Sequence, residues 1–261
     1  MRSATWNING AKARIGLLTD WLREAQPDAV VLQEIKSVDE GFPREAVEDC
    51  GYSVETHGQK GFNGVAILAR GAIEDVARGL PGDEGDEQAR WIEGTVFGEG
   101  GGAVRLCGLY LPNGNPAPGP KYDYKLAWMA RLEARAEQLL AEEWTAVLAG
   151  DYNVIPEPRD ARDFSRWTED ALGLPETRAA WRRIVNLGLH DATREVTQAD
   201  GVYSFWDYQK GAWERDDGIR IDHLLLTPQA ADRLTAAGIE SQLRGREKPS
   251  DHVPVWVELD V

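Results

Sequence analysis

The sequence predicts an α/β fold, and three patterns support this prediction. Short apolar runs with the residue types of buried strands recur along the whole chain. The first two runs flank a segment with the spacing of an amphipathic helix, which gives a strand–helix–strand order. Several runs end in Asn, Asp or Glu, at the position where α/β sheets usually place their chemistry. With 261 residues, of which 42% are hydrophobic and 28% charged, we expect a single domain over 1–261.

The strand–helix–strand unit is predicted at the N-terminus. Arg2–Ile8 alternates well enough for a first strand. Apolar residues at helical spacing follow over 11–25, and Pro27-Asp28 ends that helix. The run Ala29–Leu32 is apolar throughout, as in a strand that is buried on both faces. Both predicted strands lead directly into polar residues.

The middle of the chain continues the pattern. A short helix is predicted at 43–50, and strands are predicted at 52–56, 65–68, 73–80, 90–97, 104–111 and 146–149. The glycine-rich segment 98–102 fits a hairpin tip, and the proline-rich segment 112–120 fits an irregular surface loop. The longest helix is expected over 122–144. Its stripe of Met and Leu side chains is typical of a core, so we assign that stripe no function.

The last third of the chain contains more loops. The segment 156–174 is expected to be loop-rich with short helical turns. The other expected elements are a helix at 177–187, an aromatic strand or strand edge at 203–208, a strand at 220–226, a helical turn at 228–234 and a closing strand at 253–259. No internal repeat of fixed period is visible.

Charge and cysteine content restrict the class of protein. The formal net charge is −15, from 29 Lys and Arg against 44 Asp and Glu. Nucleic-acid binding needs positive potential, but affinity follows local charge, and a bound divalent cation reverses the sign of an acidic site. With Cys50 and Cys107 as the only cysteines, we expect a reduced compartment and no disulfide framework. The chain lacks a membrane-length apolar run and a signal-peptide pattern, so we expect a cytoplasmic protein without a membrane partner.

Five polar clusters lie at predicted strand ends or in adjoining loops. They are Asn7, Glu34, Tyr110 with Asn113, Asp151 with Asn153, and Ser250-Asp251-His252, while Asp222 lies inside the strand from 220. Each by itself is compatible with a turn, a cap or a solvated side chain. Asp151 and Asn153 are two residues apart, so an extended chain points both side chains the same way. Together the clusters predict a site for a hard divalent cation and a phosphate ester.

The residue types suit separate parts of phosphate-ester hydrolysis. Glu34 and Asp251 supply oxygen ligands of the kind that Mg²⁺ or Mn²⁺ prefers. Asp151 could accept a proton from the attacking water. Asp222 could fix the tautomer of His252 and favour its charged form, which could then contact a phosphate oxygen.

Seven motifs occur in the order in which one nuclease family has them. They are Thr5-Trp6-Asn7-Ile8-Asn9-Gly10, Leu32-Gln33-Glu34-Ile35-Lys36, Asn63-Gly64-Val65-Ala66-Ile67, Tyr110-Leu111-Pro112-Asn113-Gly114, Gly150-Asp151-Tyr152-Asn153, Arg220-Ile221-Asp222-His223 and Ser250-Asp251-His252-Val253-Pro254. Over nearly its whole length the chain resembles the exodeoxyribonuclease III and AP endonuclease family of the endonuclease/exonuclease/phosphatase superfamily. The resemblance implies a four-layer α/β sandwich, in which two packed mixed sheets are flanked by helices. It also implies a metal-dependent phosphodiesterase of DNA repair that cuts 5′ to abasic sites and has 3′→5′ exonuclease and 3′-phosphatase activity.

The resemblance further implies a role for each matching residue. Metal contacts are implied for Asn7, Glu34, Asp151, Asn153, Asp251 and His252. Catalytic roles are implied for Tyr110 on the phosphate, for Asp151 and Asn153 on the water, and for the dyad of Asp222 and His252, and Asn113 is implied to contact the phosphate. Asn9 stands where some relatives have an Asp, so the pattern leaves one or two metal ions open.

The segment 204–208 distinguishes substrates, since it resembles the pocket for a base-less sugar in the DNA-repair branch. Phe205, Trp206 and Ile221 are expected to line an apolar pocket too small for a normal nucleotide. The basic cluster 244–248 is expected to contact backbone phosphates beside the cleft. DNA contacts are therefore expected from Arg90, Asn113, Phe205, Trp206, Ile221, Arg244 and Arg246.

Two other classes remain open at this point. Phosphatases of inositol lipids and sphingomyelinases share the catalytic core, so the core does not identify the substrate. A catalytically silent nucleic-acid-binding relative would keep the fold but lack key groups, whereas Glu34, Asp151 and His252 are all present. We expect a monomer that acts on double-stranded DNA with abasic or 3′-blocked sites.

Overall fold

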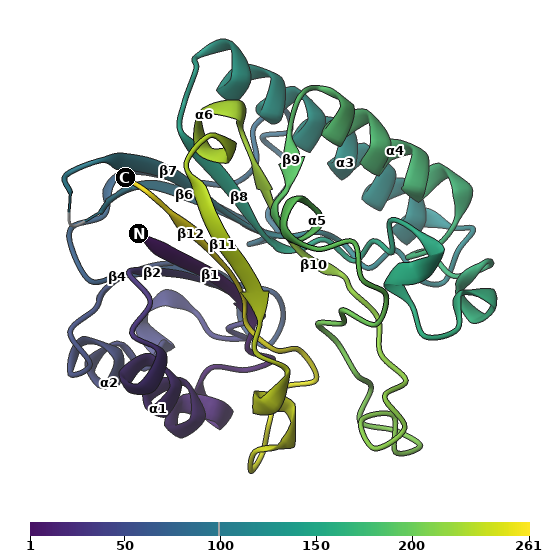
Figure 1. The fold of residues 1–261 in the computed structure, drawn as a ribbon, viewed down its shortest axis with the longest axis horizontal. Helices are drawn as coiled ribbons and strands as arrows, with labels where there is room; N and C mark the ends of the chain where they lie inside the picture. The colour runs from purple at the N-terminus through teal and green to yellow at the C-terminus, as the bar shows by residue number, and fades with distance from the viewer. Residues whose placement is uncertain (99) are drawn as a thin grey trace.

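The computed structural model describes residues 1–98 and 100–261. Two six-stranded β-sheets lie face to face, and helices cover the outer face of each sheet (Figure 1). On one outer side are α1 (Ile15–Ala25) and α2 (Arg44–Glu48), and on the other are α3 (Pro120–Ala141) and α4 (Pro175–Asn186). This arrangement confirms the predicted four-layer α/β sandwich.

The first sheet has the strand order β11-β12-β1-β2-β4-β3. Its strands are β1 (Arg2–Asn7), β2 (Ala29–Gln33), β3 (Ser53–His57), β4 (Val65–Ala69), β11 (Leu234–Ile239) and β12 (Val255–Leu259). Among the strands that the described residues form in this sheet, only β1 and β2 run parallel. The parallel pair needs a crossover connection, and α1 supplies it.

The second sheet has the strand order β5-β6-β7-β8-β10-β9. Its strands are β5 (Glu74–Arg78), β6 (Trp91–Phe97), β7 (Ala103–Tyr110), β8 (Ala146–Asp151), β9 (His190–Asp191) and β10 (Asp222–Leu226). Here β7 and β8 form the parallel pair, and α3 connects them. The short helices α5 (Ala192–Val196) and α6 (Pro228–Ala231) flank the C-terminal strands.

Three apolar layers hold the sandwich together. Between the sheets, buried side chains such as Val31 and Leu106 belong to one cluster. The sheets approach so closely that a Cβ atom on Gly108 would lie 2.5 Å from Cγ1 of Val31. Outside the first sheet, Trp21 of α1 packs edge-on against Trp6, with ring centroids 5.3 Å apart. Outside the second sheet, the apolar stripe of α3 packs on β7 and β8.

Some predicted elements differ from the structure. The segment 203–208 forms no regular strand, and Phe205 makes only isolated bridges with Ile219 and His252. The short β9 and the Ala- and Gly-containing β11 were not predicted, because neither has a clear apolar alternation. The predicted hairpin tip at 98–102 includes residue 99, which lies outside the described residues.

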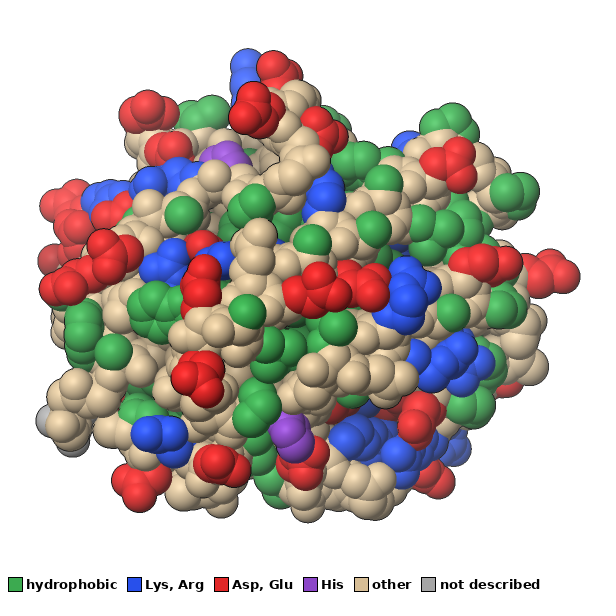
Figure 2. Space-filling model, turned by 90° about the horizontal axis from the view of Figure 1, so that it is seen from above, with side chains coloured by type: hydrophobic (Ala, Val, Ile, Leu, Met, Phe, Trp, Pro, Cys, Tyr) green, Lys and Arg blue, Asp and Glu red, His purple; other side chains and the backbone are tan. Residues whose placement is uncertain are grey.

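The surface mixes both signs of charge. On the face shown in Figure 2, acidic and basic side chains are interspersed, and neither sign forms one continuous patch across it. None of the helices formed by residues 1–98 and 100–261 combines the length and the apolar character that crossing a membrane requires.

Candidate active site

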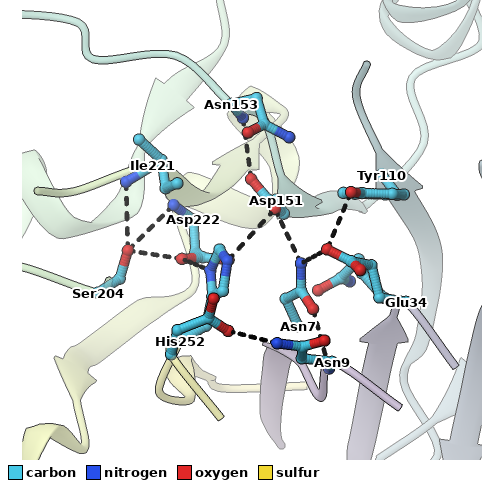
Figure 3. Close-up of polar contacts among 12 residues, drawn as sticks. Asn7, Asn9, Glu34, Tyr110, Asp151, Asn153, Ser204, Ile221, Asp222 and His252 are labelled. Carbon is cyan, nitrogen blue, oxygen red and sulfur yellow. Dashed lines mark hydrogen bonds and ion pairs between the residues drawn. The ribbon is translucent and has the colours of Figure 1, made fainter. Parts of the chain in front are cut away.

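The polar strand ends meet at one edge of the two sheets. Asn7 ends β1, and Tyr110 and Asp151 end the parallel strands β7 and β8 in register with each other. Asp222 begins the antiparallel strand β10 and pairs with Asp151 across the sheet. These side chains point toward one another from both sheets (Figure 3). Parallel strands end, and antiparallel strands begin, at the same sheet edge, which explains the convergence.

Asn7 links Glu34 to Asp151. The amide nitrogen of Asn7 donates to Oε1 of Glu34 and to Oδ2 of Asp151, each at 3.0 Å. The Tyr110 hydroxyl donates to the same Glu34 oxygen at 2.9 Å, and the Lys36 ammonium lies 2.8 Å from Oε2. Burial opposes ionisation of Glu34, but the hydrogen bonds from Lys36 and Asn7 lower its pKa. Burial raises the pKa of Tyr110, so its hydroxyl keeps its proton.

Asp222 orients the imidazole of His252. Oδ2 of Asp222 lies 2.8 Å from Nδ1 of His252 and accepts the Ser204 hydroxyl at 2.6 Å. The Ser204 oxygen in turn accepts the backbone N–H groups of Ile221 and Asp222 at 3.2 and 3.1 Å. Because Nδ1 faces Asp222, Nε2 is directed toward Asp151, 3.7 Å from its Oδ2. The tautomer and direction of the imidazole are therefore set by its neighbours.

The buried charges of this cluster shift one another's pKa values. Burial disfavours the imidazolium, but the carboxylates of Asp222 and Asp151 raise the pKa of His252 to about 10. Burial raises the pKa of Asp151 to about 7, against the opposing effect of His252. At neutral pH the imidazole therefore carries two protons, and Asp151 exchanges its proton close to that pH.

Asn153 is held in an unusual backbone conformation beside Asp151. Its φ is +47°, in the left-handed region that side chains other than glycine rarely adopt. Its N–H donates to Oδ1 of Asp151 at 2.9 Å, and its side-chain amide donates to the Leu111 carbonyl at 2.9 Å. The Asn113 amide donates to Oδ1 of Asn153 at 3.2 Å. Glu34 has a similar φ of +50°, so two residues of the site have a left-handed backbone.

A cleft of about 240 Å³ opens beside this network. Its polar wall contains Glu34, Tyr110, Asn113, Asn115, Asp151, Asn153, Asp207, Asp251 and His252. Its apolar wall contains Trp167, Leu172, Phe205, Ile219 and Ile221. The Phe205 ring packs edge-on against the His252 ring at 4.9 Å, which joins the apolar wall to the polar cluster.

Trp206 does not line this cleft, so its predicted place in the pocket is wrong. The side chain is 2% exposed and packs against Trp213, with ring centroids 5.0 Å apart. Its indole N–H donates to Asp216 at 3.1 Å. Neighbouring side chains of an extended segment point to opposite sides, so Phe205 faces the cleft and Trp206 faces away from it.

The family of the chain follows from comparison with known proteins. Residues 4–252 match the model of the Endonuclease/Exonuclease/phosphatase family. The chain belongs to the endonuclease/exonuclease/phosphatase family. It is 36% identical to exodeoxyribonuclease III of Haemophilus influenzae, in an alignment that covers 99% of this chain and 100% of the relative.

Solved structures of this family have the same fold over their whole length. An AP endonuclease from Archaeoglobus fulgidus superposes with a TM-score of 0.94 at 35% sequence identity. The 3′ phosphatase NExo from Neisseria, bound to a product DNA hairpin, superposes with a TM-score of 0.95 at 34% identity. Both matches cover 100% of this chain and 100% of the other chain.

In this family member the predicted phosphate-binding arginines occupy different environments. Arg90 lies against the cleft residue Tyr110: its guanidinium stacks over the Tyr110 ring at 4.7 Å and donates to the Tyr110 carbonyl at 3.2 Å. Arg246 is exposed and pairs with Glu24 at 2.6 Å. Arg244 is only 8% exposed, and its guanidinium donates to the Trp206 carbonyl at 3.2 Å. The phosphate contact of Arg244 stays a prediction, and in this structure its donors hold the backbone of the neighbouring loop.

The donor set of the site fits a hard divalent cation. Glu34 and Asp251 contribute carboxylate oxygens to one cleft, and the described residues also place ligand atoms of Asp151, Asp222 and His252 within 4.8 Å of one another. Oδ1 of Asp251 accepts the Asn9 amide at 3.0 Å. The Asn9 oxygen faces the Lys36 ammonium at 2.5 Å, which turns the amide nitrogen toward Asp251. Asn9 thus presents a donor to Asp251, where an Asp would present a second carboxylate.

Sequence reasoning missed three polar residues that support the site. Ser204 is 0% exposed and donates to Asp222. In the segment 204–208 only the aromatic residues were predicted to have a function. Lys36 contacts Glu34 and Asn9. It ends the motif Leu32-Gln33-Glu34-Ile35-Lys36, and that position could have indicated its role. Lys125 lies on the apolar stripe of α3, where a single charged residue among Met and Leu could have been noticed.

Proposed function

We propose that this protein is a metal-dependent DNA repair nuclease. It hydrolyses the phosphodiester 5′ to abasic sites and has 3′→5′ exonuclease and 3′-phosphatase or phosphodiesterase activity on duplex DNA. The observation that carries the proposal is the buried cluster of Asp151, Asp222 and His252 beside a small apolar pocket. The names of the relatives, an exodeoxyribonuclease III, an AP endonuclease and a 3′ phosphatase, support the same activities. We also propose that it acts as a cytoplasmic monomer.

The residues of the cluster suit a direct attack of water on phosphorus. Asp151 takes the proton of the attacking water, for which a pKa of about 7 is well matched at neutral pH. Asn153 orients this water or the phosphate beside it. The Nε2–H of the His252 imidazolium donates to a phosphate oxygen as negative charge grows there. Cleavage of the bond between phosphorus and the 3′ oxygen then releases the 3′ oxygen, which takes a proton from solvent, and leaves a 3′-hydroxyl and a 5′-phosphate.

Two further side chains keep the phosphate in place. Tyr110 retains its proton and can donate it in a hydrogen bond to a phosphate oxygen. Asn113 lies in the same cleft with its amide turned toward Asn153. Such fixed donors cost little reorganisation when the reaction occurs, and this favours the transition state.

Glu34, with Asp251 and Asn7 beside it, would hold Mg²⁺ or Mn²⁺. A bound divalent cation would neutralise charge on the phosphate. Lys36 and Asn7 keep the Glu34 carboxylate ionised, which is the form that binds a cation. Asp151, Asn153 and His252 remain candidates for further metal contacts.

The pocket supports a substrate without a base. Its apolar wall, with Phe205 and Ile221 facing the cleft, suits the carbon skeleton of a deoxyribose. A cleft of about 240 Å³ leaves little room for a purine or pyrimidine beside the sugar. A 3′-terminal sugar phosphate or an abasic nucleotide is therefore preferred over an intact nucleotide.

The test uses end-labelled duplexes with one abasic site or a 3′-phosphate, with Mg²⁺, with Mn²⁺ or with a chelator. We expect a cut 5′ to the abasic site and release of the 3′-phosphate, both dependent on the divalent ion. Inositol phosphates in a parallel assay should not be hydrolysed. Turnover of inositol phosphates without DNA cleavage would replace the proposal with a phosphatase. Binding of the duplexes without hydrolysis would indicate a non-catalytic nucleic-acid-binding protein.

A further inference from the structure

Lys125 is a fully buried lysine outside the catalytic cluster. It lies on α3, and its exposed fraction is 0%. Tyr122, Met129 and Leu132 share its face of the helix at helical spacing, and all three are buried. A Met or Leu would continue this stripe without the cost of taking a charge out of water. The polar contacts of the ammonium group therefore have to explain why a lysine is present at this position.

The ammonium of Lys125 donates to three backbone carbonyls. They belong to Asn113 at 3.1 Å, Asn153 at 2.6 Å and Ala171 at 3.1 Å. An ammonium group has three N–H donors and no acceptor, so these three carbonyls use its full capacity. Burial lowers the pKa of Lys125 to about 7, against the opposing effect of the Asp170 and Asp151 carboxylates.

The three carbonyls come from three separate loops, and all three loops line the cleft. Asn113 and Asn153 line it with their own side chains, and Leu172 follows Ala171 directly. Lys125 thus connects three loops of the cleft: the loop after β7, the loop after β8 and the loop before α4. The Asn113 amide bonded to Asn153 provides a second connection between the first two loops.

Gly114 shows how closely the first loop lies on the lysine stem. Its φ is +90°, and a Cβ atom there would lie 2.7 Å from Cδ of Lys125. A glycine is therefore required by both the backbone conformation and the space available. The loop that carries Asn113 rests directly on the methylene groups of Lys125.

We propose that Lys125 is a positioning residue for the reaction: its ammonium holds the backbones of Asn113 and Asn153 so that their side chains meet the phosphate and the water. The inference rests on the proposed nuclease function. A displacement of these loops by a fraction of an ångström would impair the chemical step more than duplex binding, because duplex contacts extend well beyond the cleft.

The experiment compares Lys125→Met, Lys125→Arg and the matched control Lys121→Met with the unchanged protein on the abasic duplex. Met keeps the length of the stem but removes all three donors, whereas Lys121 is exposed on the same helix. We expect Lys125→Met to lower kcat about 10- to 100-fold with KM changed less than about threefold. Lys125→Arg should recover part of kcat, and Lys121→Met should match the unchanged protein. Hydrogen exchange should rise at 111–115 and 151–155 in Lys125→Met.

Several results would overturn the inference without touching the proposed function. An unchanged kcat in Lys125→Met, or a change confined to KM, would do so while the unchanged protein still cleaves the duplex. If Lys125→Met does not fold, Gly114→Ala displaces the same loop away from the Lys125 stem, and an unchanged kcat in that variant would overturn the inference. Failure of the unchanged protein to cleave any duplex would instead refute the proposed function.

Discussion

At the level of single residues, the protonation of His252 depends on carboxylates that lie far from it in the sequence. Asp222 holds Nδ1 and Asp151 lies near Nε2, and together they keep a buried imidazole charged. Ser204 holds Asp222 in turn, while Oδ1 of Asp222 is a buried oxygen without a partner among the described residues. The cluster therefore holds more negative charge than its hydrogen bonds satisfy, and this favours a bound proton or cation.

Replacing Asp151 with Asn should abolish hydrolysis and spare DNA binding. The amide keeps the volume and much of the hydrogen bonding but cannot accept the proton of water, so we expect cleavage to fall about 10²- to 10⁴-fold. Fluorescence anisotropy with the abasic duplex should show an affinity close to that of the unchanged protein. Asp232→Asn, at an exposed position after α6, serves as the control. Hydrolysis that survives in Asp151→Asn would assign the base to another group.

The pH profile of cleavage should report the same pair of groups. Activity should fall below about pH 7 as Asp151 takes up a proton, and above about pH 10 as His252 loses one. Asp222→Asn removes a negative charge beside the imidazole, which lowers the pKa of His252. The pH at which kcat falls on the alkaline side should then be lower by about 1 to 3 pH units. An alkaline limb that stays in place would mean that His252 does not act in its charged form.

At the level of elements, the site depends on how the strands are paired. The parallel pairs β1–β2 and β7–β8 end at the same edge, and the antiparallel strands β10 and β12 begin there. Residues from five regions of the chain thus meet without a long loop. The two sheets must also approach closely, and Gly108 on β7 permits this by leaving room for Val31 on β2.

A methyl group at Gly108 should therefore destabilise the protein. In Gly108→Ala the new Cβ would overlap Cγ1 of Val31, so we expect the free energy of unfolding to fall by about 1 to 3 kcal/mol. Gly16→Ala is the matched control, because no atom lies within 4 Å of a Cβ there and the residue is helical. That change should stabilise the protein by up to about 1 kcal/mol. Urea unfolding measures the stability of both variants. Equal unfolding midpoints for Gly108→Ala and Gly16→Ala would contradict the close packing of the sheets.

At the level of the whole molecule, a chain with a net charge of −15 must bind DNA through local positive groups. Of the arginines near the end of the chain, Arg244 is buried in a structural role and Arg246 is exposed but paired with Glu24. Arg90 lies against Tyr110, a residue of the cleft wall. The three arginines predicted to contact DNA therefore all contact other groups of the protein, and we expect affinity for undamaged DNA to be low.

Reversing the charge at Arg246 should weaken DNA binding modestly. Loss of one phosphate contact should raise Kd about 3- to 10-fold and reduce the slope of log K against log salt concentration by about 1. Arg233→Glu is the control, because this exposed residue follows α6, at the far ends of the strands that begin at the site. An affinity that is unchanged in Arg246→Glu would show that the cluster 244–248 does not touch DNA.

The α/β class, most element positions and the polar strand ends could be read from the chain alone, since apolar periodicity and short motifs are local properties. The places of Trp206, Arg244 and Lys125 could not, because each depends on packing between distant segments. Trp206 turns away from the cleft, Arg244 is occupied by carbonyls, and Lys125 lies beneath three loops. The shifted pKa values of Asp151 and His252 likewise arise from burial and from neighbours that only the folded chain brings together.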